Sequence, residues 1–326
     1  CDEETSRRII DAYMDRGGNF LDTANIYTKG HSEVIIGDHI GRHAARRDRT
    51  VIATKFMSAM RVRDPNSGGA GRKSIISACE ESLRRLKTDY IDLYWLHFWD
   101  HFTPIEETLR TLDDLVRSGK VRYIAFSDTP AWKCAEAQTI AALKRYEPIV
   151  ALQIEYSLIE RSVEHELMPM ARAMGMGVTP WSPLKGGVLT GKYTRDSVPE
   201  EGRYAADSQH MNERTFTIVD ELVRIGKQVG ATPAQVALAW VQGRAGVDST
   251  IIGARRMDQL EDNLGAVDVS LTSEDVAALD AASEPAPVFP QRFLPGVADA
   301  FMGGATIDGQ SSDVWRMAPQ SDDEIH

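Results

Sequence analysis

The sequence predicts a parallel α/β fold in which short strands alternate with amphipathic helices. Seven short runs rich in β-branched, aromatic and other apolar residues recur along the chain, separated by stretches with helical periodicity. Most of these runs are apolar throughout, as expected for strands that are buried on both faces. Strands that alternate with crossover helices form either an open doubly wound sheet or a closed (β/α)8 TIM barrel.

Length and composition are those of a soluble globular protein. The chain has 326 residues, of which 42% are hydrophobic and 26% are charged, and a (β/α)8 barrel takes about 250 residues as one domain. The 37 basic and 48 acidic residues give a net charge of −11, which argues against nucleic acid as a partner, and no basic amphipathic segment indicates a membrane surface. Three cysteines without a CxxC pair exclude a disulfide framework, so we expect inert thiols and a cytoplasmic protein.

The expected strands lie at intervals from the N-terminal region to about residue 252. They are residues 19–22, 51–55, 91–97, 121–127, 151–155, 177–181 and 249–252. No GxGxxG motif follows the first of them, which counts against a doubly wound dinucleotide-binding sheet. The closed barrel therefore fits better, although it needs eight strands and the sequence supplies seven.

Helices are expected between the strands. The first covers residues 2–16 and ends at Gly17. Thr103, a following proline and Glu106 have the pattern of an N-cap, a first-turn proline and a capping-box acid, so a helix should run from there to about Ser118. Further helices are expected at residues 31–43, 72–86, 131–146, 163–174, 213–229, 232–242, 257–265 and 272–283.

The first expected element is a helix, and the chain starts at Cys1 without a signal-peptide pattern. We therefore expect an N-terminal piece that carries the first strand of the barrel to be missing. An open barrel exposes two long strand edges. We expect this chain to be less stable than a parent that includes the piece, which matched thermal melts would show.

Residues 1–284 should form the single barrel domain, followed by a C-terminal tail over residues 285–326. The segments 57–72 and 184–209 are long for connections in a compact domain, which is typical of lids and binding loops. The tail contains several prolines and glycines, and we expect its last ten or so residues to be disordered.

Polar and aromatic residues stand where the expected strands end, and parallel α/β folds bind ligands at this edge. Asp22, Lys55 and Tyr27 would converge on one rim, with His97 beside them. A lysine ammonium favours the phenolate of a neighbouring tyrosine, and a carboxylate fixes the lysine, so the tyrosine can give up its proton near neutral pH. Such a site suits the reduction of a carbonyl by a hydride from a cofactor. Further residues at the strand ends are Ser127, Asp128, Gln153, Trp181 and Ser182.

The segments that carry these residues resemble the signatures of the aldo-keto reductases. Residues 18–27 (GNFLDTANIY) resemble the first signature, and residues 52–55 (IATK) resemble the strand with the catalytic lysine. Residues 82–94 (SLRRLKTDYIDLY), followed by Leu96 and His97, resemble the second signature. The resemblance runs from about residue 3 to 283. It implies an (α/β)8 barrel that binds NADPH without a Rossmann motif and reduces aldehydes or ketones.

The resemblance also implies roles for single residues. Tyr27 would be the general acid, Lys55 and Asp22 the pair that tunes it, and His97 the donor that orients the substrate. The nicotinamide would be held by Ser127, Asp128 and Gln153, with Trp181 stacked on its ring. The loop around the pyrophosphate would comprise Ser182, Leu184, Gly186 and Gly187, and the adenosine end would be met by Gly253, Arg255, Gln259, Asp262 and Asn263.

Some positions depart from the family pattern. Asp128 stands where many members have Asn, and a carboxylate cannot donate a hydrogen bond to the carboxamide oxygen unless it is protonated. Trp181 replaces a common Tyr and preserves stacking. Gly253 replaces a common Lys, so a preference for NADP would depend on Arg255, with Arg256 as the alternative. The N-terminal hairpin and first strand of the family have no counterpart.

Other motifs point to other functions less well. Residues 186–193 (GGVLTGKY) are close to a P-loop, but Tyr193 stands where that motif needs Ser or Thr. His97 and His101 have helical spacing for metal ligands, yet His97 ends a strand and no third ligand is evident, so no metal is expected. A cofactor-binding module resembling potassium-channel β subunits stays open as the alternative to a reductase.

The substrate is expected to be a small carbonyl compound with hydrophobic or aromatic parts, although sugar carbonyls remain open. Ile26, Phe56, Trp99, the loop 57–72 and the tail around residues 289–301 should shape its pocket, and they are largely apolar. The sequence does not indicate an oligomeric state.

Overall fold

The computed structural model describes residues 2–195, 197, 204–205, 208–286, 288–319 and 321–325. The chain divides into two compact units, Cys1–Glu284 and Pro285–His326. Within the described part of the chain, no helix combines the length and the apolar character needed to cross a membrane.

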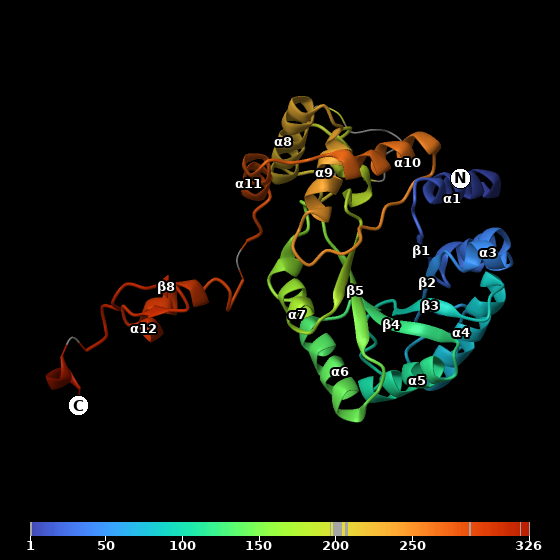
Figure 1. The fold of residues 1–326 in the computed structure, drawn as a ribbon, viewed down its shortest axis with the longest axis horizontal. Helices are drawn as coiled ribbons and strands as arrows, with labels where there is room; N and C mark the ends of the chain where they lie inside the picture. The colour runs from blue at the N-terminus through green and yellow to red at the C-terminus, as the bar shows by residue number, and fades with distance from the viewer. Residues whose placement is uncertain are drawn as a thin grey trace. The chain divides into compact units, whose positions relative to one another are not determined.

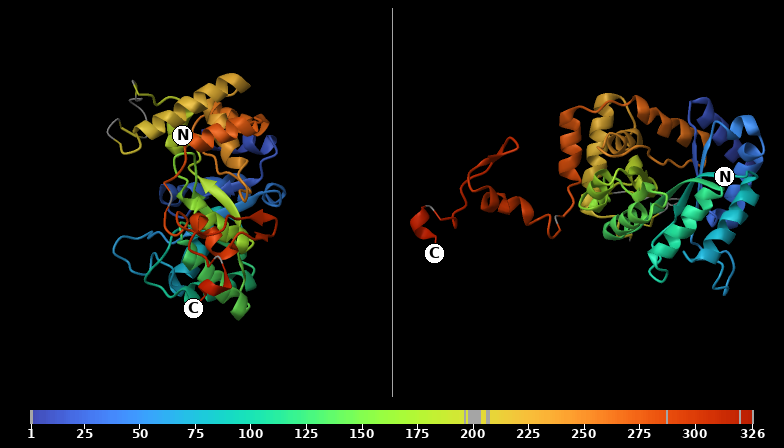
Figure 2. Two further views of the ribbon diagram at one scale, coloured as in Figure 1. Left: turned by 90° about the vertical axis from the view of Figure 1, so that its left-hand side faces the viewer. Right: turned by 60° about the horizontal axis from the view of Figure 1, so that its bottom comes forward.

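The first unit is built around a parallel six-stranded sheet whose strands lie side by side in chain order (Figure 1). The strands are β1 Phe20–Asp22, β2 Val51–Phe56, β3 Ile91–Leu96, β4 Val121–Ser127, β5 Ile149–Glu155 and β6 Gly177–Trp181. The sheet curls into half a barrel, and helices cover its outer face (Figures 1 and 2). The predicted α/β class is confirmed, and all six of these strands coincide with predicted ones to within two residues.

The predicted strand at residues 249–252 is wrong, because this stretch forms no regular ladder. The chain nevertheless runs beside β6, where the Asp248 amide donates to Val178 O at 3.0 Å and the Ile251 amide donates to Pro180 O at 2.9 Å. Donors in a parallel ladder recur every second residue, whereas these two are three residues apart. The Thr250 amide turns instead to the Gln242 side chain at 3.2 Å.

The helices of this unit lie before, between and after the strands in the sequence. They are α1 Glu3–Asp15, α2 His31–Ile36, α3 Ala44–Arg47, α4 Arg72–Leu86, α5 Ile105–Arg117, α6 Ala131–Lys144, α7 Leu167–Ala173, α8 Glu213–Val229, α9 Pro233–Gln242, α10 Met257–Leu264 and α11 Ser273–Ala282. The predicted bounds of α4 and α8 are confirmed to the residue.

The predicted helix 31–43 is helical over residues 31–41. α2 continues into a π-helical turn over Gly37–Gly41, and the separate short helix α3 begins after the predicted range. A Cβ atom at Gly41 would lie 1.8 Å from Leu86 O at the end of α4. The glycines therefore let this turn pack directly against the backbone of α4, and the π-turn changes the course of the helix there.

The predicted capping box of α5 is also wrong. The Thr103 hydroxyl donates to Asp100 Oδ2 at 2.7 Å and so does not cap the helix, which begins at Ile105 after Pro104. Asp100 additionally accepts the Ala70 amide at 2.9 Å, which ties the loop after β2 to the loop after β3. A full capping box occurs instead at Thr232, before α9.

Alternate residues of the strands point into the curled sheet and form a small inner layer. Its apolar members are Ala53, Leu93, Trp95, Ala125 and Ala151. Because side chains alternate between the two faces of a strand, the next inward positions toward the strand ends are Lys55, Ser127 and Gln153. The fold therefore places a polar layer directly above an apolar one.

The second unit contains the short helix α12 Ala298–Met302 and an antiparallel hairpin of β7 Thr306–Ile307 and β8 Gln310–Ser311. The expected disorder of the last ten residues stays a prediction, and residues 320 and 326 lie outside the described residues. Of the predicted loop 184–209, residues 196, 198–203 and 206–207 also lie outside them.

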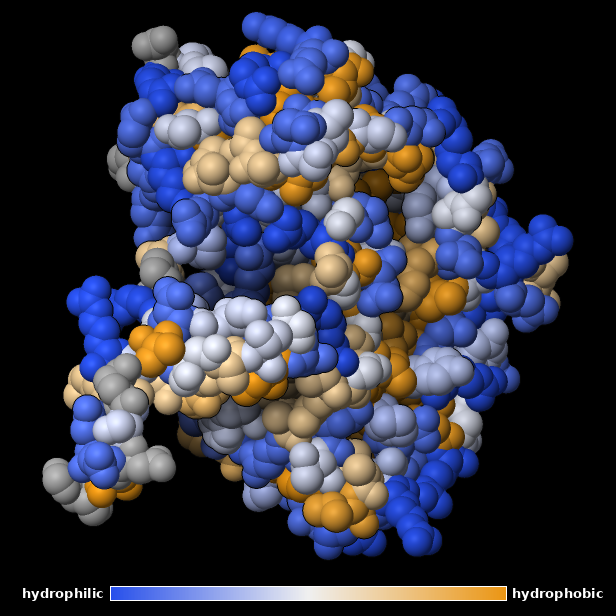
Figure 3. Space-filling model, turned by 60° about the vertical axis from the view of Figure 1, so that its left-hand side comes forward, coloured by the Kyte–Doolittle hydropathy of each residue, from blue (hydrophilic) through white to orange (hydrophobic). Residues whose placement is uncertain are grey.

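The surface seen in Figure 3 is mostly hydrophilic.

The Leu112 side chain of α5 is fully buried against the outer face of the sheet, whereas Leu143 on α6 is 78% exposed. We expect Leu112→Ala to lower the free energy of unfolding by about 2–5 kcal/mol, because it removes buried surface and leaves a cavity. The matched variant Leu143→Ala should change it by less than about 0.5 kcal/mol. Urea denaturation of both variants checks this, and equal shifts would contradict the packing described.

Candidate active site

Lys55 lies at the centre of the polar layer. It occupies the end of β2 and is fully buried. Its Nζ atom donates to the carboxylate of Asp22, to Thr23 O at 2.9 Å and to Tyr27 Oη at 3.3 Å. Three of the four predicted catalytic residues therefore meet at one ammonium group.

Asp22 ends β1, and its two carboxylate oxygens have different partners. One accepts from Lys55, and the other accepts from Gln153 Nε2 of β5 at 2.9 Å. Burial raises the pKa of the Asp22 carboxyl, and the Lys55 ammonium opposes that shift. The bond to Gln153 spans the inside of the sheet from β1 to β5, so it fixes the carboxylate from the side opposite to Lys55.

Tyr27 starts a 3-10 turn, Tyr27–Gly30, and is 39% exposed at the rim. The two residues after it have left-handed backbone angles, with φ of 47° at Thr28 and 59° at Lys29. Non-glycine residues rarely adopt this conformation, and it is concentrated at functional sites. The turn directs the phenol toward Lys55, whose Nζ lies 4.9 Å from the centre of the ring.

A buried acid that was not predicted fastens this turn to β2. Glu33 of α2 accepts from Thr54 Oγ1 at 2.6 Å and from Arg85 Nε at 2.7 Å, and its side chain is fully buried. Thr54 directly precedes Lys55 in β2. Glu33 thus links the helix that follows Tyr27 to the strand that carries Lys55. The sequence signal that could have identified Glu33 is an acidic residue early in the helix that follows the signature at residues 18–27.

His97 directly follows β3 and completes the predicted catalytic set. Its ring meets that of Tyr27 edge to face, with the ring centres 5.8 Å apart. Burial and the nearby Lys55 ammonium lower the pKa of His97 to about 4. The imidazole is therefore neutral near pH 7 and can donate one hydrogen bond and accept another.

The predicted nicotinamide residues lie at neighbouring strand ends. Ser127 and Gln153 are buried at the ends of β4 and β5. The indole Nε1 of Trp181, at the end of β6, donates to Asp128 Oδ1 at 3.0 Å. Desolvation by the surrounding strand ends, together with the negative charge of Glu155, raises the pKa of the Asp128 carboxyl.

The loop after β6 contains several residues with positive φ. Ser182, Gly186 and Gly187 all have positive φ, at 54°, 60° and 95°, and successive amides in such loops form concavities that bind anions. Leu184 accepts the Gly187 amide at 2.9 Å within the same loop.

Two lysines of this loop were not predicted as site residues. Lys185 is buried and donates to Glu155 Oε1 at 2.6 Å. The Nζ atom of Lys192 lies 3.1 Å from where a Cβ atom of Gly187 would be. Their basic charges within a glycine-rich loop were the signal that could have identified them.

The residues predicted for the adenosine end divide into two groups. Gly253 and Asn263 line one cavity, described below, and Gln259 accepts the Arg255 amide at 3.0 Å. Asp262 faces elsewhere, because its carboxylate accepts from Thr232 Oγ1 at 3.0 Å at the start of α9. No experiment or comparison tests these roles, so they stay predictions.

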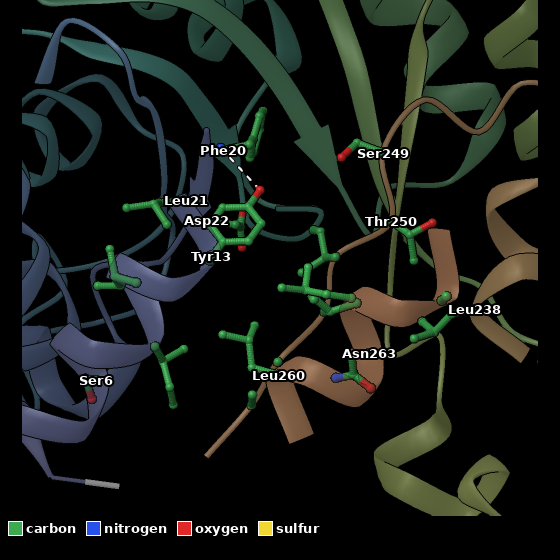
Figure 4. A pocket seen from close by; sticks show the side chains of 18 of the residues that line it. Ser6, Tyr13, Phe20, Leu21, Asp22, Leu238, Ser249, Thr250, Leu260 and Asn263 are labelled. Carbon is green, nitrogen blue, oxygen red and sulfur yellow. Dashed lines mark hydrogen bonds between the residues drawn. The ribbon is translucent and has the colours of Figure 1, made fainter. Parts of the chain in front are cut away.

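A cavity of about 480 Å³ lies between the two open sides of the curled sheet. Figure 4 shows Tyr13 of α1, Phe20 of β1, and Leu260 of α10 among the side chains that surround it. Asp22 also lines it, so the cavity reaches the catalytic cluster from the side. Among the described residues, no group of three His, Cys, Asp or Glu side chains could hold a metal ion.

The geometry has a definite chemical capacity. An exposed phenol contacts a buried ammonium, and a neutral imidazole lies beside the phenol. These groups can place a proton on an oxygen atom at the rim while the ammonium stabilises negative charge on the phenol oxygen.

A family model described as "Aldo/keto reductase family" matches residues 1–284 of the chain.

The chain belongs to the aldo/keto reductase family. The resemblance seen in the signatures is thereby confirmed, and with it the (β/α)8 barrel class, of which the curled six-stranded sheet forms part. Aldo/keto reductases are oxidoreductases that generally use NADH or NADPH. The protein is therefore an oxidoreductase of this family.

Several relatives are similar to this chain over most of their own length. An uncharacterized oxidoreductase, YrpG, of Bacillus subtilis is 38% identical, with 86% of this chain and 87% of the relative covered. Norsolorinic acid reductase B of Aspergillus parasiticus is 35% identical over 96% of this chain and 83% of its own. A probable voltage-gated potassium channel subunit beta of Arabidopsis thaliana is 37% identical, with 82% of this chain and 83% of the relative covered.

The lowered pKa of His97 can be tested by titration. We expect its imidazole to take up a proton only near pH 4, because burial and the Lys55 ammonium both oppose a second positive charge. An unfolded histidine titrates near 6.5, so this residue makes folding less favourable as pH falls from about 6.5 to about 4.

Ring-nitrogen NMR spectra recorded against pH measure this midpoint, with His97→Gln used to assign the signal. In Lys55→Met the midpoint should rise but stay below the ordinary value, since burial remains. A midpoint near 6.5 in the unmodified protein would contradict the described environment.

Proposed function

We propose that this aldo/keto reductase reduces aldehyde or ketone carbonyls to alcohols with NADPH, or catalyses the reverse oxidation. The observation that carries the proposal is the Lys55 ammonium, which hydrogen-bonds both the Asp22 carboxylate and the Tyr27 hydroxyl. The names of two relatives, an oxidoreductase and a reductase, support it.

The residues present fit a nicotinamide dinucleotide. The Trp181 indole offers a flat face, Ser127 and Gln153 offer polar partners for a carboxamide, and the loop that contains Gly186 offers backbone amides for a pyrophosphate. When bound, NADPH supplies the hydride that the protein itself cannot provide.

The protein's own groups control the proton. Tyr27 would donate its phenolic proton to the substrate oxygen, and Lys55 would stabilise the resulting phenolate by the contact already present at 3.3 Å. The neutral His97 would hydrogen-bond the same substrate oxygen and orient it. Asp22 and Gln153 would keep the lysine in place.

The preference for NADPH over NADH is assigned to Arg255. The neighbouring Arg256 is occupied, since its guanidinium donates two bonds to Asp258 at 2.9 and 2.8 Å. Arg255 is exposed and forms no ion pair with any described residue. A guanidinium without a carboxylate partner suits a 2′-phosphate.

Aromatic carbonyl compounds are the proposed substrates. The loop and helix that follow β3 and β4 present Phe98, Phe102 and Trp132, which are 42%, 85% and 64% exposed. Phe98 packs against the His97 ring, with the ring centres 5.4 Å apart, and an aromatic side chain beside a polar centre favours flat, apolar ligands. The free thiols of Cys79 and Cys134 support a reducing cytoplasm as the location.

Replacement of the proposed acid gives the direct test of function. We expect Tyr27→Phe to lower kcat for 4-nitrobenzaldehyde and NADPH by about 100- to 10,000-fold, because the proton donor is lost. Binding of NADPH should be nearly unchanged. The control Tyr123→Phe alters an exposed tyrosine on β4 and should leave both unchanged.

Retained turnover in Tyr27→Phe would contradict the assignment. Tight binding of the cofactor without turnover of any aldehyde by the unmodified protein would favour the alternative, a cofactor-binding module like the potassium channel subunit among its relatives.

The two arginines form a matched pair for the cofactor preference. We expect Arg255→Ala to raise the Kd of NADPH about tenfold with little effect on NADH, because only NADPH carries the phosphate. Arg256→Ala should change neither. Calorimetric titration measures both constants, and the opposite pattern would reassign the phosphate contact to Arg256.

A further inference from the structure

Asp128 joins three strand ends. Its amide donates to Gln153 O of β5 at 3.2 Å, its carbonyl accepts the Trp99 amide after β3 at 3.4 Å, and its carboxylate accepts the Trp181 indole N–H at 3.0 Å. In the sheet, β5 lies between β4 and β6. The bond from Trp181 to Asp128 therefore crosses the end of β5 and holds the carboxylate at the edge of the indole ring.

The other charges at these strand ends are paired. The Lys55 ammonium is paired with Asp22, and the Lys185 ammonium is paired with Glu155 at 2.6 Å. Asp128 takes part in no ion pair within the described part of the chain, and its side-chain partner is a neutral N–H group. No cation of the described residues lies within ion-pair distance of this carboxylate. The Lys55 ammonium attracts it from farther away, and the Glu155 carboxylate repels it.

We propose that Asp128 makes the site prefer the oxidised form of the nicotinamide cofactor, whose ring is cationic, over the neutral reduced form. The inference rests on the proposed function, because it places the nicotinamide ring against Trp181. A ring stacked on that indole lies beside the carboxylate that the indole holds. The carboxylate of Asp128 would then be the counter-ion of the positively charged nicotinamide ring, because the Asp22 and Glu155 carboxylates are paired with lysines.

A neutral residue at this position would not discriminate in this way. Tighter binding of NADP+ than of NADPH lowers the reduction potential of the bound couple, by about 30 mV for each tenfold in the ratio of the two constants. The bound equilibrium then shifts toward reduction of the carbonyl, in which the cofactor gives a hydride to the substrate carbon and Tyr27 gives a proton to the substrate oxygen. Asp128 is therefore a residue that sets the balance between the two directions.

The test compares Asp128→Asn with the unmodified protein. Asn keeps an acceptor oxygen for the indole and tolerates the left-handed backbone at residue 128, where φ is 41°. Calorimetry at pH 8 would give separate Kd values for NADP+ and NADPH. We expect the ratio Kd(NADP+)/Kd(NADPH) to rise about 3- to 10-fold in the variant, as for charges a few ångströms apart near solvent.

Asp114→Asn is the control, because it removes the same charge from the far end of α5, which leads into the start of β4. It should leave the ratio unchanged. Trp181→Phe keeps an aromatic face but loses the N–H donor, and we expect it to shift the ratio in the same direction by a smaller factor.

The outcomes are distinct. If neither nucleotide binds the unmodified protein, the proposed function fails. If both bind and Asp128→Asn leaves their ratio unchanged, or shifts it no more than Asp114→Asn does, the inference is overturned while the proposed function stands. Near-ultraviolet circular dichroism confirms that each variant is folded before its constants are compared.

Discussion

A buried ammonium group is the constraint on which this site depends. An unpaired lysine in a protein interior is costly, and Lys55 is fully buried at the end of β2. The surrounding structure compensates it with the Asp22 carboxylate, a backbone carbonyl at Thr23 and the hydroxyl of Tyr27. Tyr27, the proposed proton donor, is thus one of the groups that compensate the burial of the lysine, and its position follows from that requirement.

The barrel architecture supplies these partners from distant parts of the chain. Alternation along the strands places an apolar layer inside the sheet and polar side chains above it. Gln153 then reaches Asp22 across the interior, although the two residues are 131 positions apart. Outside the sheet, Glu33 joins the helix after Tyr27 to β2 and Arg85 of α4. The proposed catalytic centre is therefore held from both faces of the sheet.

The sequence predicted the features that depend on local pattern. Continuous apolar runs located β1 to β6, and the polar residue at each strand end located Asp22, Lys55 and His97, because parallel strands bring their ends to one edge. It did not predict contacts that depend on packing between elements. Thr103 binds Asp100 rather than its own helix, Glu33 and Lys185 find buried partners, and residues 249–252 lose the ladder register. Spacing along a chain does not encode such choices among competing partners.

The proposed function requires direct hydride transfer at the site organised by Lys55. It is tested by supplying NADPH deuterated at both C4 positions of the nicotinamide, together with 4-nitrobenzaldehyde, and analysing the alcohol by mass spectrometry. Direct transfer predicts one deuterium on the carbinol carbon, and none on that carbon when unlabelled NADPH is used in deuterated water. An alcohol without deuterium in the first case, or with solvent deuterium on carbon in the second, would contradict it.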